Sequence, residues 1–268
     1  MSDLEIRQSP LSDPVEEPPE AAEAPFIIWT FRRTGGTSLR SIFFWLSRFK
    51  AWQDEAFNRD RELGHITAAF EDSRDHAALD RDIAGVIGER KNLKHCIEVV
   101  PYEVTSALLR HAVAAGYRHV VLLRLNEVDR LLSLNLARMT RAWGPEEARR
   151  AYAEIRDGTR VLEPLNLQQL RRDLDRDAAA LGRLMRAMFQ QRVRYGMTLF
   201  EELYEGPIDA RLAEVRRVAA LLGLSRAETE SDGAFTGTLT GRSQGTRDIY
   251  SFVPNYDEAR ETIESLTR

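Results

Sequence analysis

The chain has 268 residues, of which 43% are hydrophobic and 30% are charged. This balance is typical of a globular protein rather than a disordered or membrane protein, and the length suffices for one large domain or two small ones. A formal net charge of -4 argues against a nucleic-acid partner held through bulk positive charge. Because Cys96 is the only cysteine, the sequence excludes a disulfide framework and a cysteine-based zinc cluster.

The beginning of the chain is rich in proline and acidic residues, as in DPVEEPPEAAEA. Such a stretch lacks the apolar surface that would offset the entropy of ordering, so we expect a disordered tail at 1–24 and a folded domain at 25–268. The apolar runs Phe26–Trp29 and Ile42–Leu46 are too short to span a bilayer, and no signal-peptide pattern is present. We therefore expect a cytoplasmic protein without a transmembrane segment.

Short apolar runs alternate with segments of helical periodicity in the first half of the expected domain. FIIWTF (26–31) predicts a buried strand, and the apolar residues of 39–49 recur at helical spacing. KHCIEVV (94–100) predicts a second strand, and EVTSALLRHAVAAG (103–116) predicts a helix that a glycine ends. HVVLLRL (119–125) predicts a third, strongly apolar strand. Strands that alternate with helices favour a parallel sheet covered on both faces.

The second half of the chain is mostly helical by periodicity. Asn126 is a plausible N-cap for a helix in which Asp129 occupies the third position. Residues 145–223 are predicted to be helical apart from one strand at 197–200, and the Gly/Ser/Thr-rich segment 225–246 is predicted to be a long loop. The predicted fold class is therefore α/β, with a P-loop-like central parallel sheet flanked by helices, in a single domain with helical additions.

The turn after the first predicted strand has the composition of an anion-binding site. It consists of Arg32, Arg33, Thr34, Gly35, Gly36, Thr37 and Ser38. Glycines let the backbone curl so that its N–H groups point inward, and a helix N-terminus adds partial positive charge. Hydroxyls and arginines can then complete a cradle for a phosphate or a sulfuryl group. The alternative is an ordinary capped turn with two surface arginines.

Other nucleotide-binding patterns are missing from this turn. It lacks the G-x-x-x-x-G-K-[ST] sequence of ATP and GTP hydrolases, and no magnesium-binding aspartate stands out at the end of a later strand. The absence of G-x-G-x-x-G disfavours a dinucleotide dehydrogenase. A turn that keeps arginine and hydroxyls without metal-coordinating partners favours group transfer without a metal.

Two motifs resemble the sulfotransferases that use 3′-phosphoadenosine 5′-phosphosulfate (PAPS), in particular their bacterial carbohydrate-type branch. Arg33-Thr34-Gly35-Gly36-Thr37 is similar to the donor loop [KR]-[ST]-G-[STG]-[ST] of that family. In VVLLRLNEVDRLLSLNLA, Arg124 and Ser133 resemble the family's second signature, an arginine and a serine that hold the 3′-phosphate of the donor. Leu125 stands where bacterial members often have a second arginine. TLFEELYEG and VPNYDEARETI resemble later segments of the family more diffusely.

This resemblance implies PAPS as the donor, no metal, and a general base for the acceptor proton. Glu55, in WQDEAFN, follows the first predicted helix, where bacterial members of the trehalose type place a glutamate. His95, in LKHCIEVVP, resembles the Lys/His strand of the cytosolic branch with a spacing that differs by one residue. Arg33 would supply positive charge to the leaving phosphate oxygen. The alternatives are a solvated loop carboxylate for Glu55 and a satisfied strand histidine for His95.

Three features outside the site carry further predictions. RRDLDRD (171–177) is predicted to form a solvated helix face with alternating charge. Trp45 and Trp52 are predicted to pack rather than to stack on a ligand. The other histidines have no metal-ligand spacing, so the sequence predicts no metal site.

The function predicted from the sequence is sulfuryl transfer from PAPS to a hydroxyl of a carbohydrate-type acceptor, either a small molecule or a glycan. Two alternatives remain open. One is a metal-dependent P-loop nucleotide kinase, and the other is a catalytically idle sulfotransferase-like binding module. The sequence identifies neither the acceptor nor the oligomeric state.

Overall fold

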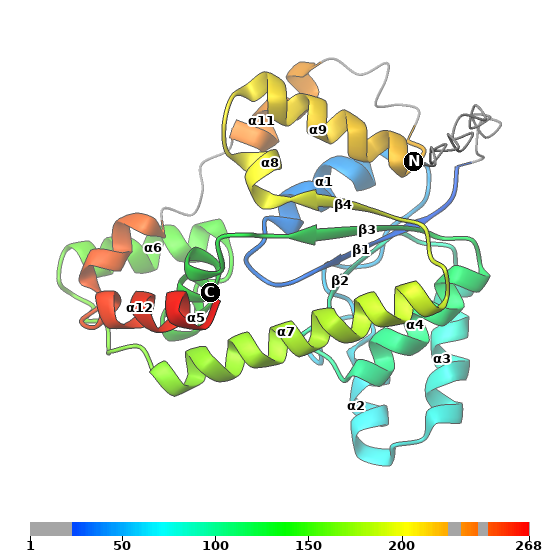
Figure 1. Ribbon diagram of the computed structural model, residues 1–268, viewed down its shortest axis with the longest axis horizontal. Helices are drawn as coiled ribbons and strands as arrows, with labels where there is room; N and C mark the ends of the chain where they lie inside the picture. Colours follow the sequence, from blue (N-terminus) through cyan, green and yellow to red (C-terminus); the bar gives the residue numbers. More distant parts are fainter. Residues whose placement is uncertain (1–22, 225–231, 241–245, 268) are drawn as a thin grey trace, which may run out of the picture.

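A parallel sheet forms the centre of the computed structural model, which describes residues 23–224, 232–240 and 246–267 (Figure 1). Within these ranges the sheet has four strands in the order β2-β1-β3-β4. The strands are β1 (Phe26–Thr30), β2 (Leu93–Cys96), β3 (Arg118–Leu123) and β4 (Tyr195–Leu199). Because β1 pairs with both β2 and β3, the turn that follows β1 lies between the ends of two neighbouring strands.

Helices cover both faces of this sheet, which explains why β1 is buried along its whole length. One face carries Trp29 and packs against α2 (Gly64–Ser73), α3 (His76–Gly88), α4 (Tyr102–Ala114) and part of α7 (Leu167–Gln190). The other face carries Ile28 and packs against α1 (Gly36–Leu46), α8 (Phe200–Tyr204), α9 (Ile208–Leu221) and α11 (Asp232–Thr240).

A third group of helices lies beyond the carboxyl ends of the strands, with a hydrophobic cluster of its own (Figure 1). It consists of α5 (Glu127–Thr140), α6 (Pro145–Arg156), η1 (Arg247–Phe252), α12 (Tyr256–Thr267) and the first part of α7. In this group, the end of the chain packs against α5, the helix that follows β3. Distant parts of the sequence therefore meet at the edge of the sheet where ligands bind in open α/β proteins.

The predicted α/β class with a parallel sheet flanked by helices is confirmed, and most predicted elements are present with shifted ends. The first helix begins at Gly36 and ends at Leu46, because Ser47 adopts an extended conformation. The second strand ends at Cys96 instead of reaching residue 100, and β4 ends one residue earlier than predicted. Gly116, with a φ of 71°, follows α4 as predicted. Helices α2 and α3 were not predicted from the sequence.

The prediction of one long loop at 225–246 is wrong where the structure describes that segment. Residues 232–240 form α11, in which Phe235 and Leu239 pack against α1 and α9. Two apolar side chains four residues apart therefore outweigh the glycine and threonine content of the helix. Residues 225–231 and 241–245 lie outside the described residues, as do residues 1–22 of the predicted tail.

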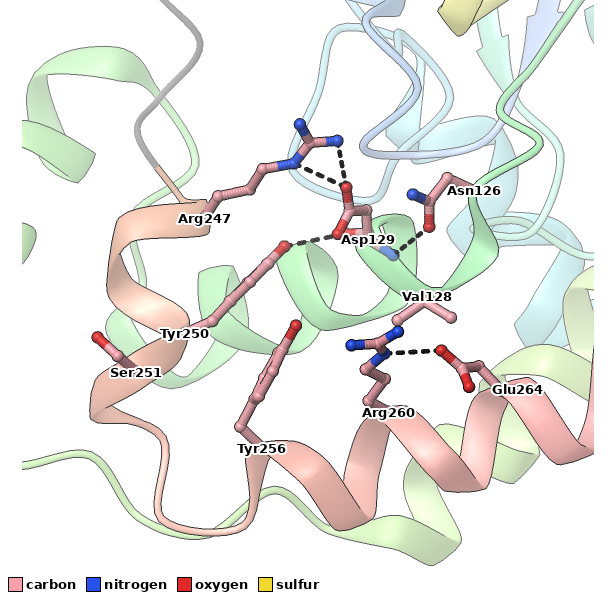
Figure 2. A pocket seen from close by; sticks show the side chains of 9 residues that line it. All are labelled: Asn126, Val128, Asp129, Arg247, Tyr250, Ser251, Tyr256, Arg260 and Glu264. Atoms are coloured by element: carbon pink, nitrogen blue, oxygen red, sulfur yellow. Dashed lines mark hydrogen bonds and ion pairs between the residues drawn. The ribbon is translucent and has the colours of Figure 1, made fainter.

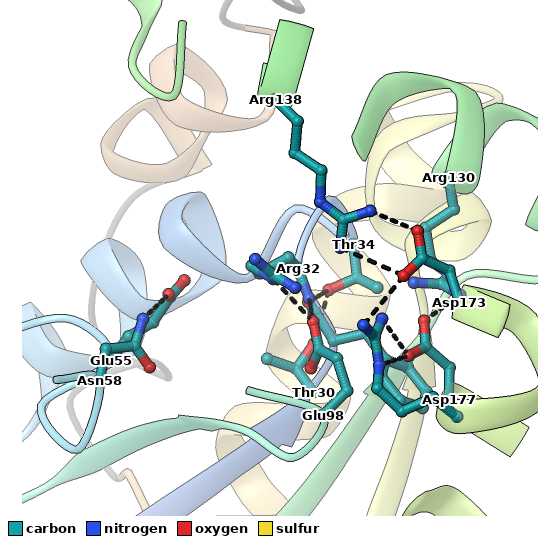
Figure 3. Close-up of polar contacts among 12 residues, drawn as sticks. Thr30, Arg32, Thr34, Glu55, Asn58, Glu98, Arg130, Arg138, Asp173 and Asp177 are labelled. Atoms are coloured by element: carbon teal, nitrogen blue, oxygen red, sulfur yellow. Dashed lines mark hydrogen bonds and ion pairs between the residues drawn. The ribbon is translucent and has the colours of Figure 1, made fainter. Parts of the chain in front are cut away.

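The prediction of a solvated face at 171–177 holds for Arg171, Arg172 and Asp175, which are exposed, but is wrong for the side of the helix that faces α5. Asp173 and Asp177 have exposed fractions of 0% and 2%, because this side of α7 packs against α5. There Asp177 Oδ2 accepts a hydrogen bond of 2.7 Å from Arg130 Nη2, and Arg138 pairs with Asp173 (Figure 3). Alternating charges in this helix thus form buried ion pairs between two helices.

Trp52 is buried as predicted, whereas Trp45 is 47% exposed, so the prediction that it packs is met only in part. Trp45 lies on the outer side of α1, next to the buried Phe43 and Leu46. In the described part of the chain, no helix is long and apolar enough to cross a membrane.

Candidate functional site

The turn after β1 is tightly constrained. Arg33 and Gly35 have positive φ angles of 67° and 78°. Any side chain at Gly35 would clash with the ring of Tyr204, whose hydroxyl donates a hydrogen bond of 2.8 Å to Gly35 O. Thr34 Oγ1 donates to Phe31 O at 2.7 Å. Glycine is therefore required for the close approach of α8, and the turn leads directly into the N-terminus of α1.

The two motifs predicted to bind the donor meet at this turn. Arg33 Nε donates a hydrogen bond of 2.8 Å to Ser133 Oγ, although the two residues are 100 positions apart in the sequence. Arg124 Nη1 donates to Arg33 O at 3.3 Å. Burial lowers the pKa of Arg33, and the nearby positive charge of Arg124 lowers it further. This part of the site concentrates positive charge where little water screens it.

The Arg124 guanidinium contacts both an aromatic ring and a carboxylate. It stacks over the ring of Phe200, with 4.2 Å between the guanidinium carbon and the ring centroid. Burial lowers the pKa of Arg124, although the carboxylate of Asp129, 3.3 Å from Nη2, acts in the opposite direction. Within the described residues, Nε of Arg124 is buried and has no hydrogen-bond partner. A buried donor without a partner is a position where a ligand oxygen would bind favourably.

Asp129 connects Arg124 to the C-terminal part of the chain. Asp129 Oδ2 also accepts hydrogen bonds from Nε and Nη2 of Arg247 at 2.9 and 2.5 Å. The hydroxyl of Tyr250 donates to Asp129 O at 3.2 Å, and Asn126 caps α5 as predicted by accepting from Asp129 N at 2.9 Å (Figure 2).

A pocket of about 580 Å³ adjoins this ion-pair chain (Figure 2). Its wall includes Tyr250 and Tyr256, whose rings stack with 5.4 Å between their centroids. Arg260 lies on the opposite side and pairs with Glu264 at 2.7 Å. Asp129 and Arg247 also line this pocket, so it borders the ion pair that they form.

On the other side of the turn, a second cluster surrounds the side chain of Lys94, which lies within β2. Lys94 Nζ lies 3.0 Å from carboxylate oxygens of both Asp54 and Glu55, and 3.3 Å from Thr37 Oγ1. Burial alone would lower the pKa of Lys94, but Cys96, Glu55 and Asp54 outweigh it and raise the pKa. The lysine is therefore a fixed positive charge at the first turn of α1.

The sequence candidate Glu55 belongs to this cluster. Its second carboxylate oxygen accepts a hydrogen bond of 2.8 Å from Asn58 Nδ2 (Figure 3). Burial would raise the pKa of Glu55, but Lys94 overcomes this effect and lowers it. Glu55 has a φ of 53°, in the left-handed region that residues other than glycine rarely adopt. The carboxylate is thus held in its charged form beside Thr37.

His95, the other candidate base, lies on the opposite face of the sheet. It alternates with Lys94 along β2, so its ring points away from the turn and packs against Trp29 and Phe57. His95 is 2% exposed, its Nε2 hydrogen-bonds to Thr105 Oγ1 at 2.9 Å, and burial lowers its pKa to about 4. His95 is therefore a core residue on the face away from the turn, although the Glu55 carboxylate is near enough to oppose the effect of burial on its pKa.

Arg32 is held by a residue that the sequence did not single out. Glu98 Oε1 accepts hydrogen bonds of 3.0 Å from both N and Nε of Arg32 (Figure 3). On its other side, the Arg32 guanidinium lies 5.8 Å from the ring centroid of Trp143, a residue that is 44% exposed. Thr37 donates to Asp54 Oδ2 at 3.1 Å, and Ser38 follows it in the first turn of α1.

Lys94, Asp54, Glu98 and Arg247 are site residues that sequence reasoning missed. Strand alternation could have identified Lys94, because it places this residue on the same face as Ile28 and α1. Asp54 and Glu98 depend on loop conformations, and Arg247 depends on how η1 packs against α5; neither has a sequence signature.

Among the residues that the structure describes, no group of three or more histidine, cysteine or carboxylate side chains could hold a metal ion. Comparisons of the chain with protein-family models, with curated proteins and with solved structures gave no match. The site must therefore be interpreted from its own geometry.

Proposed function

We propose that the protein is a PAPS-dependent sulfotransferase with a P-loop-like donor site, which sulfates a hydroxyl of a carbohydrate-type acceptor. The observation that carries this proposal is the 2.8 Å hydrogen bond from Arg33 Nε to Ser133 Oγ. It joins the glycine turn to the second motif, so groups suited to two anionic ends of one ligand lie side by side at the carboxyl edge of the sheet.

The proposed donor would bind across this junction. The backbone N–H groups of the turn, the N-terminus of α1 and Arg33 suit the phosphosulfate end. Arg124 and Ser133 suit the 3′-phosphate. The pKa of both arginines is lowered by burial, so an anionic ligand would restore the stabilisation that their charges lose on leaving water.

In the proposed reaction, the acceptor oxygen forms a bond to sulfur while the bond between sulfur and the bridging phosphate oxygen breaks. The acceptor proton passes to the carboxylate of Glu55. The bridging oxygen leaves with its electron pair as part of 3′-phosphoadenosine 5′-phosphate (PAP), and the charge of Arg33 stabilises it. Because its pKa is lowered, Glu55 is deprotonated at neutral pH and able to accept this proton.

An exposed aromatic side chain supports a carbohydrate-type acceptor. Trp143 lies beside Arg32, at the start of the glycine turn, and its backbone N donates to Glu147 Oε2 at 2.8 Å, which fixes the loop before α6. An indole face can stack on the apolar face of a sugar ring, while the Arg32–Glu98 pair offers hydrogen bonds to hydroxyls.

The direct test of this proposal is transfer of radiolabelled sulfate from PAPS to a panel of glycans, compared with a sample that contains ATP, magnesium and the same glycans. Sulfated glycan in the first sample supports the proposal. Phosphorylated product in the second sample alone would support the kinase alternative.

One observation favours the alternative of an idle binding module. Both carboxylate oxygens of Glu55 already have partners, Lys94 and Asn58. That alternative predicts nucleotide binding without label transfer to any hydroxyl acceptor, so binding and turnover measured on the same sample separate the two possibilities.

A further inference from the structure

The carboxylate of Asp129 lies between two arginines, Arg124 after β3 and Arg247 at the start of η1. Asp129 Oδ2 is 3.3 Å from Arg124 Nη2 and 2.5 Å from Arg247 Nη2, and the Asp129 side chain is only 12% exposed. A single oxygen thus holds two guanidinium groups that come from distant parts of the sequence. Phosphate oxygens are the other common partners for guanidinium groups held in this way.

This arrangement leaves part of Arg124 unsatisfied. The side chain of Arg124 is nine-tenths buried, yet its Nε has no hydrogen-bond partner among the described residues. Since burial of an unpaired donor costs free energy, a ligand with several oxygens would satisfy Arg124 better than Asp129 does.

The surroundings also allow Asp129 to release the arginines. The adjoining pocket of about 580 Å³ has Asp129 and Arg247 in its wall, so the carboxylate has space beside it into which it can turn (Figure 2). Glu205, 3.3 Å from Arg247 Nη2, would keep Arg247 at the site when Asp129 moves.

We propose that Asp129 and the 3′-phosphate of the ligand compete for the same position between Arg124 and Arg247. This inference rests on the proposed function, because it concerns the same donor site. The carboxylate holds the arginines in place, and a dianionic phosphate displaces it, whereas a nucleotide without a 3′-phosphate does not. Asp129 thereby sets the affinity for the 3′-phosphate.

A purely structural role for Asp129 predicts the opposite effect. If the carboxylate only positions Arg124, its removal leaves the guanidinium misplaced and weakens nucleotide binding. If it competes with the phosphate, its removal strengthens binding. The sign of the change therefore decides between the two roles.

The experiment measures the dissociation constants of PAP and AMP by titration calorimetry for the wild type, Asp129→Asn and Glu264→Gln. Glu264→Gln is the matched control, because it breaks an ion pair in the same pocket that does not involve Arg124. We expect Asp129→Asn to bind PAP about tenfold more tightly, with AMP binding changed by less than about twofold and the control unchanged. Unchanged or weaker PAP binding by Asp129→Asn would overturn the inference.

Two further measurements keep this test decisive. If Asp129→Asn does not fold, a crystal structure of the wild type with PAP replaces it. In that structure the Arg124–Asp129 pair must be broken, and its retention refutes the competition.

If the wild type does not distinguish PAP from AMP, the proposed function fails. Inorganic phosphate then tests the competition separately, because it must raise the Tm of Asp129→Asn more than that of the wild type. An equal rise in both proteins would contradict it.

Discussion

The two strand ends that flank the glycine turn differ in their electrostatics. At the end of β3, burial lowers the pKa of Arg33 and Arg124, which indicates positive charge with incomplete compensation. On the β2 side, Cys96, Glu55 and Asp54 outweigh burial and raise the pKa of Lys94, and Glu98 does the same for Arg32. One side of the turn is therefore suited to an anion, and the other holds a carboxylate, Glu55, in its charged form.

This contrast matches the needs of group transfer between an anionic donor and a neutral hydroxyl. The donor requires cations that a bound phosphate can neutralise. The acceptor requires a base whose charge is already balanced, so that its negative charge does not repel the donor. Substitutions on the two sides should consequently have different effects, with turnover lost on one side and nucleotide affinity on the other.

The largest effect is expected on the β2 side. Glu55→Gln keeps the shape of the side chain and removes its basicity, so we expect turnover to fall by about 10²–10⁴-fold. PAP binding should remain close to that of the wild type, because Glu55 does not belong to the arginine cluster. The measurement is a steady-state sulfation assay combined with calorimetric titration of PAP.

His95→Ala is the companion to this substitution. Since His95 lies on the opposite face of the sheet, it should lower the stability of the fold and cost less turnover per folded molecule than Glu55→Gln. Normal turnover in Glu55→Gln, combined with an inactive but folded His95→Ala, would show that the base has been misassigned.

On the β3 side, Arg124→Ala removes a charge-assisted hydrogen bond to the proposed 3′-phosphate, worth roughly 1.5–3 kcal/mol. PAP binding should weaken by about tenfold to a hundredfold, and the preference for PAP over AMP should be largely lost. Arg260→Ala, in the neighbouring pocket, serves as the control and should bind PAP like the wild type. A preference that survives in Arg124→Ala contradicts the assignment of this arginine.

A smaller effect is expected at the acceptor side. Trp143→Ala should raise the KM for a glycan acceptor by roughly threefold to tenfold, the effect of losing about 0.5–1.5 kcal/mol of stacking, with the KM for PAPS unchanged. Trp45→Ala is the matched control, because Trp45 is similarly exposed, at 47% against 44%, but lies on the outer side of α1. Equal effects of the two substitutions would exclude a specific role for Trp143.

The smallest expected effect is on the pH dependence of stability. The pKa of Glu55 is lower in the folded protein than its unfolded value of about 4.3, so its contribution to stability is complete above that value. The contribution disappears as the pH falls through the folded pKa. Between pH 7 and pH 3, the Tm of the wild type should therefore drop by about 2–4 °C more than that of Glu55→Gln. Parallel curves would show that the Lys94–Glu55 pair adds no stability.

The sequence predicted the part of the site that rests on backbone topology. Parallel strands end at the same edge of a sheet, so the glycine turn after β1 and Arg124 after β3 had to lie close together. Helical periodicity then brought Ser133, about two turns into α5, to the same place.

The buried ion pairs and the other contacts of the site depended on packing between elements, which local sequence patterns do not reveal. The alternating charges of α7 did not show which side faces α5, so the burial of Asp173 and Asp177 was missed. Lys94 resembled an ordinary strand residue until the loop that carries Asp54 and Glu55 folded over it. Arg247 reaches Asp129 across 118 residues, a separation over which no periodicity extends.

The most direct test of the central claim is a thermal-shift titration of the wild type with PAP and with AMP, which differ by the 3′-phosphate. A ligand that binds only the folded state raises the Tm, and at the same concentration a tighter ligand raises it more. If the glycine turn and the Arg124–Ser133 motif hold the two ends of one nucleotide, PAP must raise the Tm far more than AMP at the same concentration. Equal shifts for the two nucleotides, or a shift only with ATP and magnesium, would contradict that claim.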